Sequence, residues 1–319
     1  MLTSLLLVAL GLVGLYFGAE WLVRGAARLA AALRVRPLFI GLTVVAFGTS
    51  APEFVVTVVA AVQGNSAVAL GNVLGSNIAN VGLILGVTAL IAPVKVSLQV
   101  VNRELPVMVA ATLVFYALAW RLEIGRVTGA FFALSLIAFT WLALRWAQRE
   151  SAAVADEFRA YEQKEGLLRG FKVARDVALI VVGLAALVSG GHALVVGAVD
   201  LARRASISDA VIAVSLVAVG TSLPELACSI VAALRKEADI VVGNLVGSNL
   251  FNILGALGLA AAVRPLAVEA ALLRFDFIAM LIFSVAMAVV LRSGNVVSRV
   301  EGGALVLGYV GFVAALFLR

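Results

Sequence analysis

The sequence has very few of the residues that build disulfides, zinc sites and soluble surfaces. Among its 319 residues there is one cysteine, Cys228, and one histidine, His192, and only 13% of the residues are charged. A single cysteine excludes an internal disulfide, and a lone cysteine and histidine do not make a zinc or copper site. With 63% hydrophobic residues, an ordinary soluble domain is also excluded. The composition instead indicates a polytopic membrane protein.

Ten apolar segments account for most of the chain. Each has roughly 20 residues, enough for a helix to cross ~30 Å of hydrocarbon. The first segment has neither the basic leader nor the small-residue cleavage site of a signal peptide, so we interpret it as a span. We therefore predict an all-α, polytopic membrane protein with spans at residues 4–24, 38–62, 66–92, 104–121, 127–146, 176–200, 208–233, 239–263, 271–291 and 302–318.

The basic residues indicate orientation rather than a nucleic-acid partner. The net charge of +6 comes from arginines and lysines that are spread over the predicted loops. They are more frequent in the loops on the same side as the central polar stretch, so the positive-inside rule predicts both termini outside and the central loop in the cytoplasm. This stretch, residues 147–172, is the only long polar segment, and its charges at helical spacing predict a short solvated helix.

Two stretches of the chain carry the same polar motifs in apolar surroundings. GTSAPE at 48–53 and GNVLGSN at 71–77 recur as GTSLPE and GNLVGSN, with a constant offset of 172 residues and no gap. Five spans per half is an odd number, so the second half must enter the membrane from the other side, as an inverted repeat. We predict a first repeat at 1–146 with its motif region at 41–92, a linker at 147–172, and a second repeat at 173–319 with its motif region at 213–264.

Each copy of the first motif places a glutamate directly after a proline within a predicted span. Pro52 lacks an N–H and its ring crowds the carbonyl four residues back, so we expect the helix to break before Glu53. A half-helix that starts there favours a carboxylate in its first turn. Pro224 and Glu225 repeat this arrangement. Because acids at membrane depth are costly and usually functional, the duplicated glutamate predicts a cation site.

The second motif supplies further oxygen atoms. Asn72, Ser76 and Asn80 follow one another at intervals of four residues, so they share one face of a helix, and the second copy repeats this stripe. Hydroxyl, amide and carboxylate oxygens are hard donors that suit Ca²⁺ or Na⁺ and do not suit zinc or copper.

Other interpretations explain less of the pattern. One GTSxPE motif alone is more simply a proline kink, but a kink does not explain a duplicated intramembrane glutamate. An intramembrane protease needs a serine with a His or Lys partner, and Ser50 has no such context. A passive channel has no use for an occluded site with two carboxylates. Glu20 and Arg24 are four residues apart and predict a structural ion pair, with a gating role as the alternative.

With both motifs in both halves, the chain resembles the cation/Ca²⁺ exchanger superfamily, and the prokaryotic sodium/calcium exchanger branch most closely. The resemblance covers nearly the whole chain. It implies a secondary transporter rather than an enzyme, working without a cofactor and as a monomer, that exchanges Ca²⁺ for Na⁺ by alternating access in the inner (cell) membrane of a prokaryote. It also implies that the cations bind to the side chains of Thr49, Ser50, Glu53, Ser76, Asn80, Thr221, Ser222, Glu225, Ser248 and Asn252 and to the backbone carbonyls of Ala46 and Ala218.

The chain departs from the family pattern at the centre of the expected site. Sodium/calcium exchangers commonly have Asp where this chain has Asn252, and potassium-dependent relatives have Asp at both central positions, here Asn80 and Asn252. With Glu53 and Glu225 as its acids, the site carries at most a charge of −2, which balances one Ca²⁺ or two Na⁺. The usual exchange of three Na⁺ for one Ca²⁺ is therefore in question, and an H⁺/Ca²⁺ or K⁺-dependent antiporter is the alternative.

Overall fold

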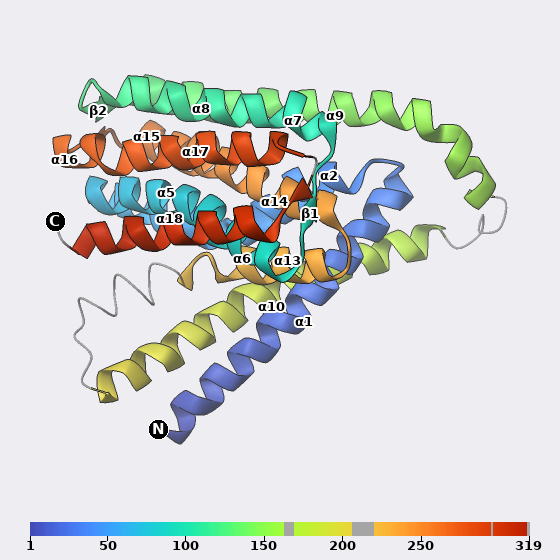
Figure 1. The fold of residues 1–319 in the computed structure, drawn as a ribbon, viewed down its shortest axis with the longest axis horizontal. Coiled ribbons are helices and arrows are strands. Elements are labelled where there is room, and N and C mark those ends of the chain that lie inside the picture. The colour runs from blue at the N-terminus through green and yellow to red at the C-terminus, as the bar shows by residue number, and fades with distance from the viewer. Residues whose placement is uncertain (163–168, 206–219, 295, 318–319) are drawn as a thin grey trace. The chain divides into compact units, whose positions relative to one another are not determined.

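The chain is almost entirely helical (Figure 1). A computed structural model describes residues 1–162, 169–205, 220–294 and 296–317, and their side chains except those of 149–172 and 317. Segments labelled η are π-helical. The described elements are α1 (Leu2–Leu33), α2 (Pro37–Ile40), η1 (Gly41–Val45), α3 (Ala46–Thr49), α4 (Ala51–Val62), α5 (Ser66–Ala79), η2 (Asn80–Leu85), α6 (Gly86–Ile91), β1 (Val94–Lys95), α7 (Leu98–Asn102), α8 (Glu104–Ala119), β2 (Glu123–Ile124), α9 (Arg126–Glu162), α10 (Arg169–Arg204), α13 (Leu223–Leu234), α14 (Ala238–Leu250), η4 (Phe251–Leu257), α15 (Gly258–Val263), β3 (Leu266–Ala267), α16 (Ala270–Arg274), α17 (Asp276–Arg292), β4 (Val296–Val297) and α18 (Arg299–Phe317).

The lengths of the helices agree with the predicted membrane spans. Eight of the described helices are long and apolar enough to cross a membrane, and a ninth span results if the two helices interrupted at Ser50 are counted as one. The predicted span 208–233 falls partly on residues 206–219, outside the described residues, and its described part contains the apolar helix α13. In the predicted polar linker, α9 continues as a helix to Glu162. The prediction of an all-α, polytopic membrane protein is confirmed.

The sequence repeat is also a repeat of secondary structure. Four pairs of elements begin and end at positions 172 residues apart: α4 with α13, α6 with α15, α7 with α16, and β1 with β3. Where both repeats are described, these paired elements therefore follow one another in the same order, as the gap-free register of the motifs predicts.

The helices gather into two compact units that each contain parts of both repeats. Unit 1 consists of Met1–Thr49 and Ala138–Asn244, and unit 2 of Ser50–Ile137 and Leu245–Arg319. The long helices α9 and α14 continue from one unit into the other. The boundaries predicted for the repeats refer to the order of the sequence, and they stay a prediction.

In unit 1, α1 and α10 lie side by side and antiparallel, and their glycines allow the two backbones to touch (Figure 1). A Cβ atom on Gly11 would lie 2.7 Å from the backbone nitrogen of Leu194, and one on Gly183 would lie 2.7 Å from that of Leu22. Gly11 and Gly183 are equivalent in the two repeats, as are Leu22 and Leu194. The contact is therefore reciprocal, which is the property of an interface with twofold symmetry, and small residues permit such close packing in membranes.

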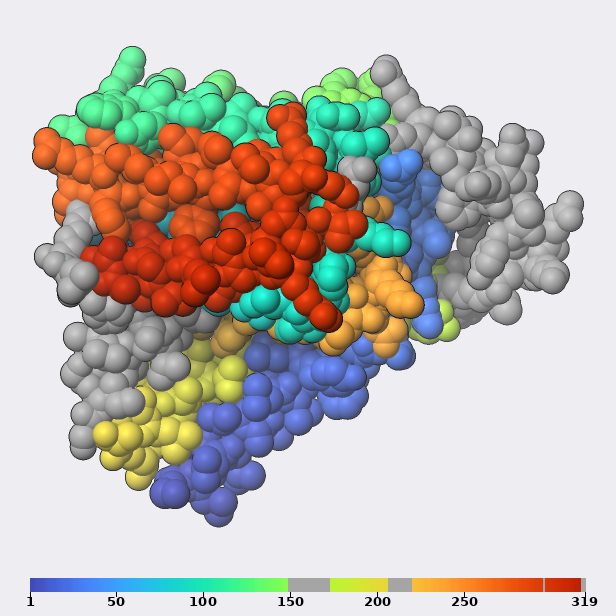
Figure 2. Space-filling model, in the orientation of Figure 1, coloured from blue at the N-terminus to red at the C-terminus, as the bar shows by residue number. Residues whose placement is uncertain are grey.

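Unit 2 shows the same reciprocity in its strands and helices. Strand β1 pairs with β4 and β2 pairs with β3, both antiparallel, so each repeat contributes one strand to each two-stranded sheet. Helices α8 and α17 pack together, and the hydroxyls of Thr112 and Ser284, equivalent residues, are 3.4 Å apart. Helices α17 and α18 form the orange-to-red surface in Figure 2. They carry exposed apolar side chains, among them Ile282 and Leu307, as expected for helices that face lipid.

Candidate cation site

In unit 2, the helix break predicted from Pro52 is present, and it places Glu53 in the first turn of a new helix. Helix α4 begins at Ala51 with its proline in the first turn, and the amide of Phe54 donates to the carbonyl of Ser50 at 3.0 Å. Proline is tolerated there because the first N–H groups of a helix have no partner within it. Glu53 is only 1% exposed. The local sequence therefore positions one buried carboxylate at the positive end of a helix dipole.

Asn72 on α5 holds this turn in place from the neighbouring helix. Its Nδ2 donates to the backbone carbonyl of Glu53 at 3.0 Å and to Oγ1 of Thr57 at 2.9 Å. Both protons of the amide are therefore used to join α5 to α4. The polar stripe predicted on α5 exists, but its first member supports the glutamate-bearing helix.

Unit 1 contains the second copy of this arrangement, built from equivalent residues. Helix α13 begins at Leu223, the amide of Leu226 donates to the carbonyl of Ser222 at 3.0 Å, and Glu225 is 1% exposed. On α14, Nδ2 of Asn244 donates to Oγ of Ser229 at 3.3 Å. Asn244 and Ser229 are the equivalents of Asn72 and Thr57, so the same side-chain bridge joins the two helices in each repeat.

Thr49 is fixed by the amide of Asn244, which also joins α14 to α13, the helix that carries Glu225. Its Oγ1 lies 3.1 Å from Oδ1 of Asn244, to which it donates, and 3.4 Å from the backbone carbonyl of Ala46. Thr49, Ala46 and Asn244 are all buried. Unit 1 thus brings together a hydroxyl, a carbonyl from the end of the first half-helix and the amide next to the second glutamate-bearing helix.

Asn80 is the first residue of the π-helical segment η2, and Asn252 is the second residue of η4. Each of these two central asparagines is only 1% exposed. In unit 2, Nδ2 of Asn80 donates to Oδ1 of Asn249 at 3.0 Å, and Nδ2 of Asn249 in turn lies 3.5 Å from the sulfur of Met108. This chain of contacts orients the carboxamide of Asn80. π-Helical segments within α-helices are frequent at functional sites.

Several buried oxygen atoms of unit 2 have no hydrogen-bond partner among the described residues. They include Oδ1 of Asn80, Oδ1 of Asn252 and Oγ of Ser248, and the amide nitrogen of Asn252 also lacks one. A buried polar atom left in this state costs about 1–3 kcal/mol. Oxygens that are buried, hard and uncommitted are what a dehydrated Ca²⁺ or Na⁺ ion needs as ligands.

The chemistry of the site follows from what surrounds the two glutamates. No group of three His, Cys, Asp or Glu side chains that could hold a metal ion comes together among the described residues. The available donors are therefore one glutamate carboxylate in each unit, Glu225 in unit 1 and Glu53 in unit 2, together with hydroxyl, amide and carbonyl oxygens. Such a set suits a hard, exchangeable cation better than a transition metal.

The structure places the predicted site residues in two groups. Unit 1 contains Ala46, Thr49, Thr221, Ser222 and Glu225, and unit 2 contains Ser50, Glu53, Ser76, Asn80, Ser248 and Asn252. All of these are buried except Thr221, which is partly exposed. Ala218 lies outside the described residues.

Three supporting residues were not predicted from the sequence: Thr57, Ser229 and Asn249. Thr57 and Ser229 are 172 residues apart and both carry a hydroxyl, and Asn249 repeats Asn77 at the end of each second motif. Thr57 and Ser229 could have been found by comparing the two repeats beyond the motifs.

Comparison with known proteins identifies relatives along the whole chain. The model of the family described as "Sodium/calcium exchanger protein" matches residues 3–145 and 176–318. The "Putative antiporter CaxA" of Alkalimonas amylolytica is 37% identical over 99% of both chains. The "Sodium/calcium exchanger MaX1" of Methanosarcina acetivorans is 34% identical over 98% of both chains.

A solved structure shares the fold. The sodium-calcium exchanger NCX_Mj, in crystals soaked with zero Na⁺ and Ca²⁺, aligns with a TM-score of 0.84 at 28% sequence identity, over 99% of both chains. The arrangement of helices described above is therefore that of a known membrane ion exchanger.

Proposed function

The chain belongs to the sodium/calcium exchanger family, and from this premise we propose that it is an antiporter that exchanges Ca²⁺ for Na⁺ across a prokaryotic cell membrane. One observation carries the proposal above all others. Glu53 and Glu225, equivalent residues of the two repeats, are each buried in the first turn of a helix that restarts after a break. Two buried acids with the same local structure are best explained as ligands of transported cations.

In the proposed mechanism, Ca²⁺ and Na⁺ compete for the same two carboxylates. The two half-sites together form one cation site, as expected for the interface of inverted repeats. An empty site leaves two like charges in a medium of low dielectric constant, so it is unfavourable to move. Occupancy by either cation neutralises the site and permits the switch between the two accessible states, which couples the two fluxes.

The ligands of this site are the residues that both repeats contribute at equivalent positions. Glu53 and Glu225 provide the charge, while hydroxyl and amide oxygens replace the hydration shell. The uncommitted oxygens of Asn80, Ser248 and Asn252 support this role for three of them. The other proposed side-chain ligands are Thr49, Ser50, Ser76, Thr221 and Ser222, and the proposed backbone ligands are the carbonyls of Ala46 and Ala218.

The asparagines at the centre set the proposed stoichiometry. Because Asn80 and Asn252 are neutral, Glu53 and Glu225 provide a total charge of −2, which balances one Ca²⁺ or two Na⁺. Exchange of two Na⁺ for one Ca²⁺ moves no net charge. Exchange of three moves one net charge, and the membrane potential then contributes about 2.3 kcal/mol per 100 mV to each cycle. We therefore expect uptake of Ca²⁺ to be insensitive to an imposed potential.

An H⁺/Ca²⁺ antiporter is the second candidate, because the neutral centre formed by Asn80 and Asn252 puts the usual exchange of three Na⁺ for one Ca²⁺ in question. The protein acts as a monomer in both cases, with its termini outside and the α9–α10 connection in the cytoplasm, the orientation that the positive-inside rule predicts.

Uptake of radioactive Ca²⁺ into proteoliposomes tests the proposal. The full chain is reconstituted and given an outward gradient of Na⁺, H⁺ or K⁺ in separate experiments. We expect uptake with the Na⁺ gradient only, and loss of uptake in Glu53→Gln and Glu225→Gln. Glu123→Gln, which alters an exposed glutamate on β2, serves as the matched control. Equal uptake by the parent and both glutamine variants would rule out the two-carboxylate site, and uptake with the H⁺ gradient alone would favour the second candidate.

A further inference from the structure

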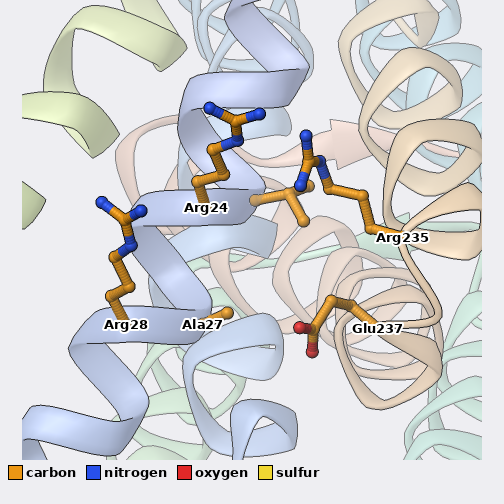
Figure 3. A pocket seen from close by; sticks show the side chains of 6 residues that line it. Arg24, Ala27, Arg28, Arg235 and Glu237 are labelled. Carbon is orange, nitrogen blue, oxygen red and sulfur yellow. The ribbon is translucent and has the colours of Figure 1, made fainter.

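A cavity in unit 1 lies apart from the half-site of Glu225. It has a volume of about 490 Å³ and is found where the C-terminal part of α1 meets the turn between α13 and α14. Figure 3 shows the arginines around it: Arg24 and Arg28 come from α1, and Arg235 comes from the turn. Glu237 lines the same cavity from the side of α14. A volume of this size is typical of a site for a small ligand.

The arginines around the cavity exceed the buried acids that pair with them. Glu20, buried on α1, accepts from Arg235 and forms an ion pair of 2.5 Å with Arg24. Asp176, buried on α10, lies 3.9 Å from Arg28 and 3.3 Å from Arg175. Four guanidinium groups thus share two buried carboxylates. With Glu237 and its neighbour Asp239 both ionised, four acids balance the four arginines, so the positive charge is in excess only while Glu237 is protonated.

The guanidinium groups keep part of their surface open. The side chains of Arg24, Arg28 and Arg235 are 48%, 50% and 35% exposed, whereas those of Glu20 and Asp176 are 10% and 5% exposed. The buried acids therefore contact the arginines from the interior of the protein, and the exposed N–H groups of the arginines remain available to a ligand. Arg28 has the longest of these ion-pair distances and so the most weakly engaged guanidinium.

We propose that this cavity binds a phosphate-bearing anion, held by Arg28 together with Arg24 and Arg235. The planar guanidinium presents parallel N–H groups that match two oxygens of a phosphate, and charge-assisted bonds of this kind are strong. The anion is either the head group of an acidic phospholipid or a soluble phosphate compound, and both offer the same oxygens. It would bridge α1 to the end of α13, the helix whose first turn carries Glu225.

Glu237 gives the proposed site a dependence on pH. Burial and the neighbouring Asp239 raise the pKa of Glu237, and Arg235 lowers it by a smaller amount. A proton on Glu237 removes the one carboxylate that lines the cavity, while Arg24, Arg28 and Arg235 keep their charge. Binding of a phosphate group whose own charge stays constant, such as a phosphodiester, is therefore expected to strengthen as the pH falls.

Direct binding measurements on the purified full chain test the site without any transport step, so they succeed or fail independently of the exchange proposal. Equilibrium dialysis with radiolabelled inorganic phosphate measures binding of the soluble anion. Native mass spectrometry of delipidated protein, titrated with phosphatidylglycerol or with phosphatidylcholine, measures binding of the lipid. Saturable binding of inorganic phosphate identifies a soluble ligand, and preference for phosphatidylglycerol without phosphate binding identifies a head group.

Three variants make the assignment specific. Arg28→Gln is expected to weaken binding about tenfold or more. Glu237→Gln is expected to strengthen binding and to remove the pH dependence of phosphatidylglycerol binding, the test being made with this probe because inorganic phosphate has a second ionisation of its own near neutral pH. Lys95→Gln, which removes one exposed charge from β1 in unit 2, should change nothing. The thermal midpoint of each variant in detergent confirms that it is folded. The proposal is overturned if neither probe saturates. It is also overturned if Arg28→Gln and Lys95→Gln both bind as the parent does, since the arginines would then serve only in ion pairs within the protein or as anchors at the membrane surface.

Discussion

Asn80 donates a hydrogen bond from Nδ2 to Oδ1 of Asn249, at 3.0 Å, and thereby an asparagine of one repeat is oriented by an asparagine of the other. The equivalent pair is not formed in the same way. Asn77, the counterpart of Asn249, donates instead to the carbonyl of Val73 on its own helix, and neither amide atom of Asn252 has a partner among the described residues. Two stretches that carry asparagines at the same positions thus adopt different side-chain arrangements at the centre of unit 2.

The first prediction concerns this positioning role of Asn249. Asn249→Ala removes the acceptor of Nδ2 of Asn80, so the carboxamide of Asn80 is no longer held with its oxygen away from Asn249. We expect the apparent affinity for Ca²⁺ to fall about threefold to tenfold, the equivalent of one lost hydrogen bond. Asn77→Ala is the matched control, because Asn77 bonds only within its own helix and should have a smaller effect. Uptake measured against Ca²⁺ concentration separates the two, and equal shifts in both variants would contradict the role.

The second prediction concerns the bridge between α5 and α4. Asn72→Ala removes the bonds to the carbonyl of Glu53 and to Oγ1 of Thr57 and should lower the free energy of unfolding by about 1–3 kcal/mol. Thr57→Val keeps the shape and loses only the second bond, so its effect should be smaller. Denaturant or thermal unfolding in detergent measures both, and a larger loss in Thr57→Val than in Asn72→Ala would show that the bond to Glu53 is unimportant.

The third prediction uses a turn that the repeats share but fill differently. Gly64 and Lys236 are equivalent and both have positive φ angles, +83° and +63°. A residue with a Cβ atom pays about 1–2 kcal/mol in this region, and glycine does not. Gly64→Ala should therefore destabilise the protein and Lys236→Gly should stabilise it by up to about 1 kcal/mol. Lys236→Ala removes the same charge but keeps the Cβ, so a rise in thermal midpoint with Lys236→Ala as large as with Lys236→Gly would contradict the explanation.

The fourth prediction concerns the pH dependence of stability at Glu237. Burial is the main cause of its raised pKa, so the folded state holds the proton more tightly than the unfolded chain. The stabilisation is full below the unfolded pKa, about 4.3, and is lost as the pH rises through the raised pKa of the folded state. Relative to Glu237→Gln, the parent should lose thermal stability as the pH rises above about 4.3 and through the raised pKa of its folded state. The exposed Glu123→Gln should follow the parent, and parallel curves for all three proteins would falsify this account.

The sequence predicted those features that depend on local chemistry. Proline in the interior of an apolar helical segment removes an N–H and crowds the carbonyl four residues back, so the interruptions at Ser50 and Ser222 and the buried glutamates after them could be placed from the motifs alone. The ion pair of Glu20 with Arg24 followed in the same way from helical spacing. The inverted repeat followed from the constant offset and the odd number of spans.

Features that depend on contacts between distant segments could not be predicted. The spacing of Asn72 gives the face of the helix on which it lies but not its partner, so its role as a bridge rather than a ligand required coordinates. Glu20 also binds Arg235, 215 residues away, and no helical period reveals that contact. The assembly of each compact unit from pieces of both repeats is likewise set by tertiary packing and not by the order of the segments.

The glycine contact between α1 and α10 has a consequence for the origin of the molecule. Since Gly11 approaches Leu194 as Gly183 approaches Leu22, a polypeptide with a single repeat would carry a surface that fits an upside-down copy of itself. Such a chain could assemble as a homodimer with opposed orientations before any fusion of its genes. Joining the two copies then fixes their ratio at one to one, and it allows the copies to differ at equivalent positions such as Gly64 and Lys236.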